Sequence, residues 1–301
     1  MSTYDVVVVG GGPVGAALAL ELRAARFDVA IIEARAAAPA ASALRPLALS
    51  YGSRLILERI GLWNALEPAT AIERIHVSQR GRFGRTLLTA AEAALPALGY
   101  VTDYAALVAR LDAAVEASGL TVIRGARVTS IAHDPVSARV EYSTAAGQLS
   151  VGECIAPLVV VADGSALTAD VDVRTTDYGQ SAVTALVETE VPHRHTAYER
   201  FTPDGPIALL PFAKRYALVW TTQRGNAAEL TGASAPTFLS LLQARFGERL
   251  GRFIGVEGRS SHDLTLRVAE STSVGRAVLI GNAAQALHPV AGQGFNLGLR
   301  D

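Results

Sequence analysis

Cysteine and long apolar segments are nearly absent from this chain of 301 residues. A single cysteine, Cys154, excludes an internal disulfide and a zinc site built from several thiolates, so a reducing compartment is permitted. Apolar runs are only as long as a strand, whereas a membrane-spanning helix needs about 20 residues. The N-terminus has no basic leader, which indicates that no signal peptide is present. These absences predict a protein that is soluble or peripheral to a membrane.

An excess of charge of either sign is also absent. The 27 Lys and Arg residues balance the 28 Asp and Glu residues, so the chain as a whole does not attract nucleic acid or anionic lipid. One local basic run, Arg80, Arg82 and Arg85, is open to three interpretations: a solvated loop, an entrance for NAD(P)H, or a contact with an anionic membrane. The hydrophobic content of 50% predicts a folded protein with a substantial core.

A glycine-rich loop follows the first apolar run. Residues 4–9 read as a buried parallel strand, residues 16–22 as a helix and residues 29–33 as a second strand. The loop between them contains G-x-G-x-x-G, with Gly10, Gly12 and Gly15 in the motif. Glycines permit a tight turn and close backbone approach, and the helix N-terminus offers free N–H groups to a pyrophosphate. Glu33 ends the second strand, where its carboxylate can accept from an unphosphorylated ribose, so the motif indicates FAD or NAD.

A second glycine-rich run decides between these two cofactors. A predicted strand at residues 277–280 leads into Gly281, and a helix is expected to begin near Gly294. The free N–H groups of that helix would face a second polar part of a large ligand. NAD needs one such helix end, whereas FAD, with its polyol and isoalloxazine, needs two. We therefore expect FAD.

The run at residues 281–298 resembles the G-D-A-A-x-x-x-x-P-x-x-G-Q-G-x-N motif of the p-hydroxybenzoate-hydroxylase-like flavoprotein monooxygenases. Three further stretches, residues 45–53, 75–78 and 199–206, are similar to the ubiquinone-biosynthesis branch of that family, the 2-octaprenyl-6-methoxyphenol hydroxylases. Asn282 stands where the family has an aspartate, which keeps hydrogen bonding but removes a negative charge.

The resemblance implies a set of cofactor contacts. The first loop would hold the pyrophosphate, Glu33 the adenosine ribose, and the backbone of Val128 the adenine. Arg45 would lie near the phosphates or the flavin, and Asn282 beside the ribityl chain. The residues expected to bind FAD are Gly10, Gly12, Pro13, Val14, Gly15, Glu33, Ala34, Arg35, Arg45, Val128, Asp163, Gly281, Asn282, Pro289, Gly292, Gln293, Gly294, Phe295 and Asn296.

No side chain is expected to act as a nucleophile, because the flavin carries the chemistry. His288 and Pro289 are the candidates for the flavin face, and for His288 a role in shaping the loop is an equal alternative. His193 and His195 share one face of an extended segment, but they lack the cysteine and acid pattern of a metal site, so no metal is expected.

The fold class that follows is α/β, with a Rossmann-like FAD domain and an inserted, mostly antiparallel β substrate domain. We expect the FAD domain to comprise residues 1–74, 99–177 and 265–301, and the substrate domain residues 75–98 and 178–264. The family resemblance implies a further C-terminal helical segment after the helix near Gly294. The chain is therefore expected to lack that segment and to be inactive or nearly so.

The resemblance implies hydroxylation of a polyprenylated phenol in ubiquinone biosynthesis, by a C4a-hydroperoxyflavin formed from O₂ after NAD(P)H reduces FAD. Two alternatives stay open: a flavin-binding sensor or assembly subunit without turnover, and a hydroxylase or epoxidase of another apolar substrate. The expected location is the cytoplasm, with association at the inner membrane or with a biosynthetic complex as a further option. The sequence does not decide the ring substrate, the prenyl length, the choice between NADH and NADPH, or the oligomeric state.

Overall fold

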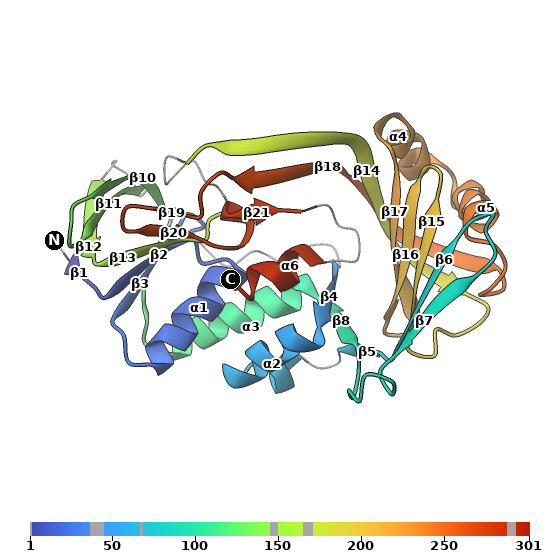
Figure 1. The fold of residues 1–301 in the computed structure, drawn as a ribbon, viewed down its shortest axis with the longest axis horizontal. Helices are drawn as coiled ribbons and strands as arrows, with labels where there is room; N and C mark the ends of the chain where they lie inside the picture. The colour runs from blue at the N-terminus through green and yellow to red at the C-terminus, as the bar shows by residue number, and fades with distance from the viewer. Residues whose placement is uncertain (1, 37–44, 67–68, 145–149, 165–170, 288–292) are drawn as a thin grey trace.

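The computed structural model describes residues 2–36, 45–66, 69–144, 150–164, 171–287 and 293–301 (Figure 1). Six strands form a mostly parallel sheet in the order β19-β20-β13-β2-β3-β9, and only β19 pairs antiparallel with its neighbour. These strands are β2 (Val6–Val9), β3 (Val29–Glu33), β9 (Thr121–Arg124), β13 (Leu158–Val161), β19 (Ser273–Val274) and β20 (Ala277–Leu279). We call this sheet and the elements that cover it the parallel half.

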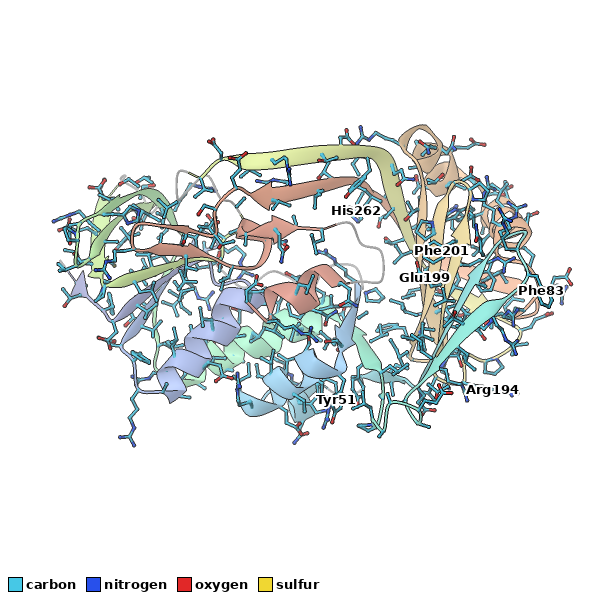
Figure 2. All side chains as sticks on the ribbon, in the orientation of Figure 1. Tyr51, Phe83, Arg194, Glu199, Phe201 and His262 are labelled. Carbon is cyan, nitrogen blue, oxygen red and sulfur yellow. The ribbon has the colours of Figure 1, made fainter. Side chains whose placement is uncertain are left out.

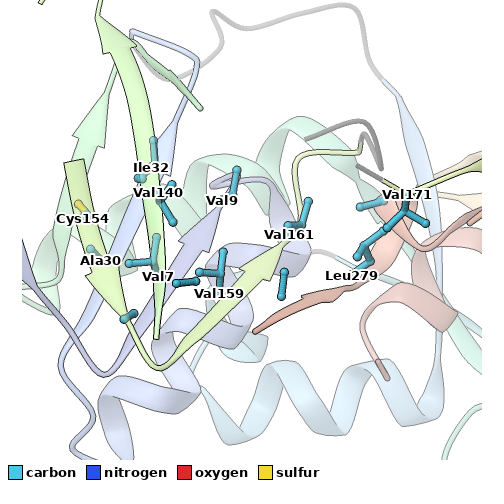
Figure 3. Close-up of a cluster of buried hydrophobic side chains, with 14 of the residues drawn as sticks. Val7, Val9, Ala30, Ile32, Val140, Cys154, Val159, Val161, Val171 and Leu279 are labelled. Carbon is cyan, nitrogen blue, oxygen red and sulfur yellow. The ribbon is translucent and has the colours of Figure 1, made fainter. Parts of the chain in front are cut away.

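Both faces of the parallel sheet are covered, which explains the uninterrupted valines of β2. Helices α1 (Pro13–Ala24) and α3 (Tyr104–Ala117) lie on one face, where Val8 packs with them. The opposite face packs against a four-stranded sheet through Val7 and Cys154 (Figure 3). That second sheet consists of β1 (Ser2–Thr3), β10 (Ala126–His133), β11 (Ala138–Thr144) and β12 (Ser150–Ala156).

A sheet of eight strands forms the other half of the molecule, in the order β21-β18-β14-β17-β16-β15-β6-β7. Its strands are β6 (Arg74–Gln79), β7 (Arg85–Thr89), β14 (Val173–Thr189), β15 (Thr196–Thr202), β16 (Gly205–Phe212), β17 (Arg215–Gln223), β18 (Phe253–Ala269) and β21 (Gln285–Ala286). Helices α4 (Arg224–Gly232) and α5 (Ala235–Phe246) cover one face, where Trp220 packs edge-on against Phe238. We call this the large-sheet half. Its pairing is antiparallel except between β15 and β6.

A small sheet of three strands connects the two halves. It contains β4 (Pro46–Ser50), β5 (Thr70–Ile72) and β8 (Gly99–Asp103), with α2 (Tyr51–Arg59) and the 3₁₀ helix η1 (Trp63–Leu66) beside it. Ile72 and Val101 of this sheet form a small core with Ala197 of β15. The large sheet thus turns one face to α4 and α5 and the other toward the parallel half.

Strands β14 and β18 run from one half into the other (Figure 1). They pair from Val173 with Ala269 in the parallel half to Thr189 with Phe253 in the large-sheet half. Their register shifts between Asp177 and Gln180. The boundaries proposed from the sequence, 177/178 and 264/265, fall at this bulge, and the division into two domains stays a proposal.

The α/β architecture with a mostly antiparallel insertion agrees with the sequence prediction. The predicted strands at residues 29–33 and 196–202 coincide with β3 and β15. Several elements were not predicted, among them helices α2 and α4, strands β6 and β11, and the long strand β18, whose residues include several charged and polar side chains. The helix expected near Gly294 is α6 (Gln293–Gly298), and η3 (Gly281–Ala283) follows β20.

Candidate functional site

The glycines of the first loop have two different roles: two allow close packing within the protein, and one leaves open space beside the start of α1. Gly10 has φ +102°, and a Cβ there would lie 2.6 Å from the backbone of Asp163. A Cβ on Gly15 would lie 2.1 Å from the carbonyl oxygen of Gly10, so both positions require glycine for packing within the protein. Gly12 instead has nothing within 4 Å of its Cβ position and precedes the first residue of α1. This leaves open space at the N–H groups of the helix N-terminus, where an anion is favoured.

Glu33 is the last residue of β3, and its side chain contacts this loop. Its Oε2 accepts a hydrogen bond from Gly11 N at 2.8 Å and one from the Arg35 guanidinium at 3.0 Å, and its Oε1 accepts from Arg35 N at 2.8 Å. Burial by itself would raise the pKa of Glu33, but the hydrogen bonds and charge of Arg35 and the Gly11 N–H outweigh it and lower the pKa. The carboxylate is therefore ionised and held in place, and its remaining lone pairs can accept from a ribose diol.

A cavity of about 710 Å³ opens over the loop. Eight of the predicted cofactor residues line it: Gly10, Gly12, Pro13, Glu33, Ala34, Arg35, Val128 and Asp163. The rest of its wall was not predicted from the sequence and consists of Val9, Ile32, Tyr104, Ala126, Arg127, Thr129 and Ala162. Three strand ends and two helix starts meet here, which is where ligands bind in open α/β sheets.

Arg45 lies at the margin of this cavity rather than in its wall. Its guanidinium carbon is 4.8 Å from the centre of the Tyr104 ring, and its backbone N donates to Asp103 Oδ1 at 2.9 Å. Tyr104 itself lines the cavity. The positive charge of Arg45 is thus held beside the cavity by a stacking contact.

The second glycine motif meets the first one in space. Gly281 has φ +59°, and its Cβ position lies 3.4 Å from the methyl groups of Val14. A Cβ on Gly298 would lie 2.8 Å from Gly281 Cα, so this contact also requires glycine. Asn282 is exposed, and its Cβ lies 3.8 Å from the Cβ position of Gly164, the residue after Asp163 in the cavity wall. The two motifs, far apart in the sequence, therefore form one continuous surface.

Helix α6 is fastened by an asparagine that the sequence assigned to the cofactor. Asn296 is 2% exposed, and its Oδ1 accepts from Ser50 N and Ser53 Oγ, both at 2.7 Å. Its Nδ2 donates to Ala48 O at 3.0 Å. The Phe295 side chain likewise packs into the core with α1 and α3. The side chains of both residues thus contact the protein, which leaves only their backbone groups for the FAD contact that the sequence predicts.

Of the remaining predicted residues, Gln293 and Gly294 open α6. His288, Pro289 and Gly292 lie outside the described residues.

On the large sheet, a carboxyl group faces the parallel half among apolar neighbours. Glu199 pairs with Ala208 on one side and Val77 on the other, and these three side chains share one face. Ala197, two residues earlier, packs on Val101 of the small sheet, which shows which half this face looks toward (Figure 2). Burial raises the pKa of Glu199 to about 7. Within the described part of the chain its carboxyl has no hydrogen bond or ion pair, so this half-buried group is a candidate contact for a polar atom of a ligand.

Comparison with known proteins agrees with this geometry. Residues 3–301 match the family described as FAD binding domain. The chain belongs to this family. The ubiquinone hydroxylase UbiL of Rhodospirillum rubrum is 36% identical over 314 residues, covering 99% of this chain and 70% of the relative. The 3-demethoxyubiquinol 3-hydroxylase of Escherichia coli is 32% identical, covering 99% of this chain and 77% of the relative.

Among solved structures, the p-nitrophenol 4-monooxygenase of Pseudomonas putida superposes with a TM-score of 0.74 at 20% identity, covering 99% of this chain and 78% of the other. The predicted family, an FAD-dependent monooxygenase of the ubiquinone-biosynthesis branch, is confirmed, and so is FAD as the cofactor. The cavity, with its open space at Gly12 and the ionised Glu33, fits the adenosine diphosphate part of that cofactor.

The described part of the chain holds neither a metal-binding cluster nor a membrane-spanning helix. Among the described residues there is no group of three or more His, Cys, Asp or Glu side chains that could hold a metal ion. His193 and His195 each bond to a backbone carbonyl oxygen instead, those of Ala213 and Ala71. No helix in the described ranges is long and apolar enough to cross a membrane.

Proposed function

We propose that this monooxygenase hydroxylates the ring of a polyprenylated phenol in ubiquinone biosynthesis, using NAD(P)H and O₂. The observation that carries the proposal is the similarity over 99% of the chain to two proteins named for hydroxylation of ubiquinone or a ubiquinol precursor. The face around Glu199 adds support, because Val77 and Ala208 offer apolar contacts to an apolar ring and Glu199 offers one polar group to orient it.

The residues of the first loop would hold the cofactor by its phosphates. The N–H groups at the start of α1 would donate to the pyrophosphate above Gly12, and Glu33 would accept from the adenosine ribose. Val128 would contact the adenine, and Asn282 would donate to the ribityl or phosphate oxygens. When bound, FAD supplies the transfer of electrons from NAD(P)H and the activation of O₂.

Glu199 would accept a hydrogen bond from the phenol hydroxyl. When its carboxyl is ionised it has only acceptor sites, so a phenol O–H lying on this face would donate to it. Proton removal from a phenol makes its ring richer in electrons, which favours attack by an electrophilic oxygen. Its half-buried position between Val77 and Ala208 limits the access of water to that carboxyl.

The proposal is tested with purified protein reconstituted with FAD. Oxidation of NADH or NADPH is followed with a series of prenylated phenols, and the products are identified by mass spectrometry. Product formed in proportion to the nicotinamide consumed is expected. Bound flavin that no phenol helps to reduce would instead support the sensor, and hydroxylation of only non-phenolic apolar compounds would support the other enzyme class.

A polyprenylated substrate lies in a membrane, so the proposed function includes contact with the membrane surface. A peripheral enzyme can reach such a substrate without a spanning helix. Co-sedimentation of the holoenzyme with lipid vesicles checks this part of the proposal. Full activity toward a prenylated substrate that is presented in vesicles, without any binding to the vesicles, would contradict it.

A further inference from the structure

The turn between β6 and β7 projects from the outer edge of the large sheet. Strand β7 is the last strand of that sheet, and Phe83 in the turn is 108% exposed, more than any other large apolar side chain of the described residues. Gly81 and Gly84 flank the turn at φ +72° and +111°, with nothing within 4 Å of their Cβ positions. Figure 2 places Phe83 at the end of the molecule remote from the parallel half.

The turn is fixed to the body of the sheet rather than loose. Arg80 N donates to Phe201 O on β15 at 2.8 Å, and Arg82 N donates to Gln79 O at 3.4 Å. The last ladder pair before the turn joins Ser78 to Arg85. When a partner buries an exposed aromatic ring on a turn that is already fixed, little conformational entropy is lost.

Positive charge surrounds this aromatic ring. Arg80 and Arg82 lie in the turn and Arg85 begins β7, and no ion pair of the described residues includes any of them. Burial, together with the nearby charges of Arg249 and Arg80, lowers the pKa of Arg200 on β15. Arg80 is therefore close enough to Arg200 to repel it, and a partner that brings negative charge to this edge relieves that repulsion.

We infer that the β6–β7 turn, residues 80–85, is the surface by which the enzyme docks on an anionic lipid bilayer, with Phe83 inserted between the headgroups. The inference rests on the proposed function, which requires a substrate that resides in the membrane. An aromatic ring ringed by arginines is the composition that binds at the interface of anionic membranes. Leu87 and Leu88 of β7, 45% and 47% exposed, add one apolar side chain to each face of this edge strand.

Both parts of the surface are expected to contribute measurably. Loss of one arginine near an anionic surface weakens binding by about fivefold, and loss of a buried phenylalanine by roughly tenfold. The charge contribution is also expected to weaken in high salt, because the Debye length falls below about 10 Å.

The test is flotation of the holoenzyme with vesicles of phosphatidylcholine alone, or of phosphatidylcholine mixed with phosphatidylglycerol. The variant Phe83→Ser with Arg82→Gln is compared with a matched control, Val136→Ser with Arg110→Gln. The control changes the same kinds of side chain, since Val136 is 72% exposed and Arg110 is exposed on α3. We expect wild type and control to float with the anionic vesicles only, and the turn variant to bind on the order of 50-fold more weakly.

A second measurement separates this inference from the proposed function. Flavin content and hydroxylation of a short-chain, water-soluble phenol are expected to be unchanged in the turn variant. If no phenol is hydroxylated but the turn variant still loses vesicle binding, the proposed function fails and the docking surface stands. Equal flotation of the turn variant and wild type overturns the inference. So does a rise in KM for NAD(P)H or a change in oligomeric state without loss of vesicle binding.

Discussion

The two halves of the molecule arrange their functional groups by different means. In the parallel half, backbone contacts decide the site: Gly10 and Gly15 pack against other backbone atoms, and Gly281 does so with Gly298. In the large-sheet half, the register of β15 between β6 and β16 decides which side chains share a face. Backbone packing allows one residue type, whereas a sheet face tolerates many. The parallel half is therefore recognisable as a motif in the sequence, whereas the shared face of the large sheet is not.

The largest loss of stability and of bound flavin is expected at Gly15, where the backbone leaves no room for a side chain. In Gly15→Ala the new Cβ would lie 2.1 Å from Gly10 O, so the loop must move. We expect a loss of stability of about 3 kcal/mol and flavin content near background. A thermal melt and the absorbance of released flavin check this.

Gly12→Ala sharpens the first test, because its Cβ meets only open space. It should keep the melting temperature of wild type and still lose flavin. Gly225→Ala in α4, which also meets nothing within 4 Å, serves as the control and should change neither. A normal melt and full flavin in Gly15→Ala would contradict the assignment of that glycine to packing.

Glu199→Gln tests the large-sheet half. If Glu199 accepts the phenol proton, kcat/KM of wild type falls below about pH 7, where the carboxyl becomes protonated. The variant should be about 100-fold slower and lose that dependence. His262→Gln is the control, because His262 lies on the same face, opposite Ala182.

The stability of the same variant gives a reading that is independent of turnover. The folded pKa of Glu199 is raised, so its contribution is fully present below the ordinary value of 4.5 and is lost as the pH rises through about 7. The melting temperature of wild type should therefore decrease as the pH is raised from 4.5 to about 7, and that of Glu199→Gln should not. If neither kcat/KM nor the melting temperature changes its pH dependence in the variant, Glu199 does not take part in the site.

A smaller effect is expected for Glu33→Gln. The variant retains the acceptor oxygen but weakens the bonds to Gly11 N and Arg35, so FAD affinity should fall about tenfold. The pKa of Glu33 is lowered on folding, so its stabilisation is present above the ordinary value of 4.5 and is lost as the pH falls through the lowered pKa. Wild type should then lose stability in acid more steeply than the variant. Titration of apoprotein with FAD and melts at several pH values measure both.

The smallest effect is expected for Asn282→Asp. Asn282 is exposed beside Gly164, where an added charge is well solvated. We expect the fold to be retained and FAD to bind about twofold to threefold more weakly, from repulsion of the phosphates. The affinity should recover in high salt. Loss of folded protein in a melt would show instead that the amide is structural.

The sequence predicted the parts of the fold whose signal is local. The valines of β2 require a sheet covered on both faces, and the order of strand, glycine loop and helix is a short-range pattern. Strand β18 carries charged residues on a partly exposed ribbon, so its pattern did not predict a strand. Its pairing with β14 is what makes it one.

The same distinction applies to the site. Asn296 belongs to a cofactor motif, yet its side chain bonds to Ser50 and Ser53, which are distant in sequence. A contact between residues so far apart in the sequence becomes visible only in the folded structure. Glu199 was part of a family-like stretch, but its burial depends on Val77 and Ala208 on neighbouring strands.

The pairing of β14 with β18 also bears on the order in which the protein is made. The pairing of Thr189 with Phe253 closes residues 190–252 into a unit whose strands pair with near neighbours. Such short-range contacts form quickly, whereas the parallel sheet must bring together β2, β13 and β20 from both ends of the described chain. The parallel sheet is therefore complete only once residues 277–279 are available, whereas the strands β15, β16 and β17 that pair with one another all lie earlier in the chain. Until β20 pairs with β13, one edge of β13 has no partner, so an incomplete chain presents an open strand edge at the centre of what becomes the parallel sheet.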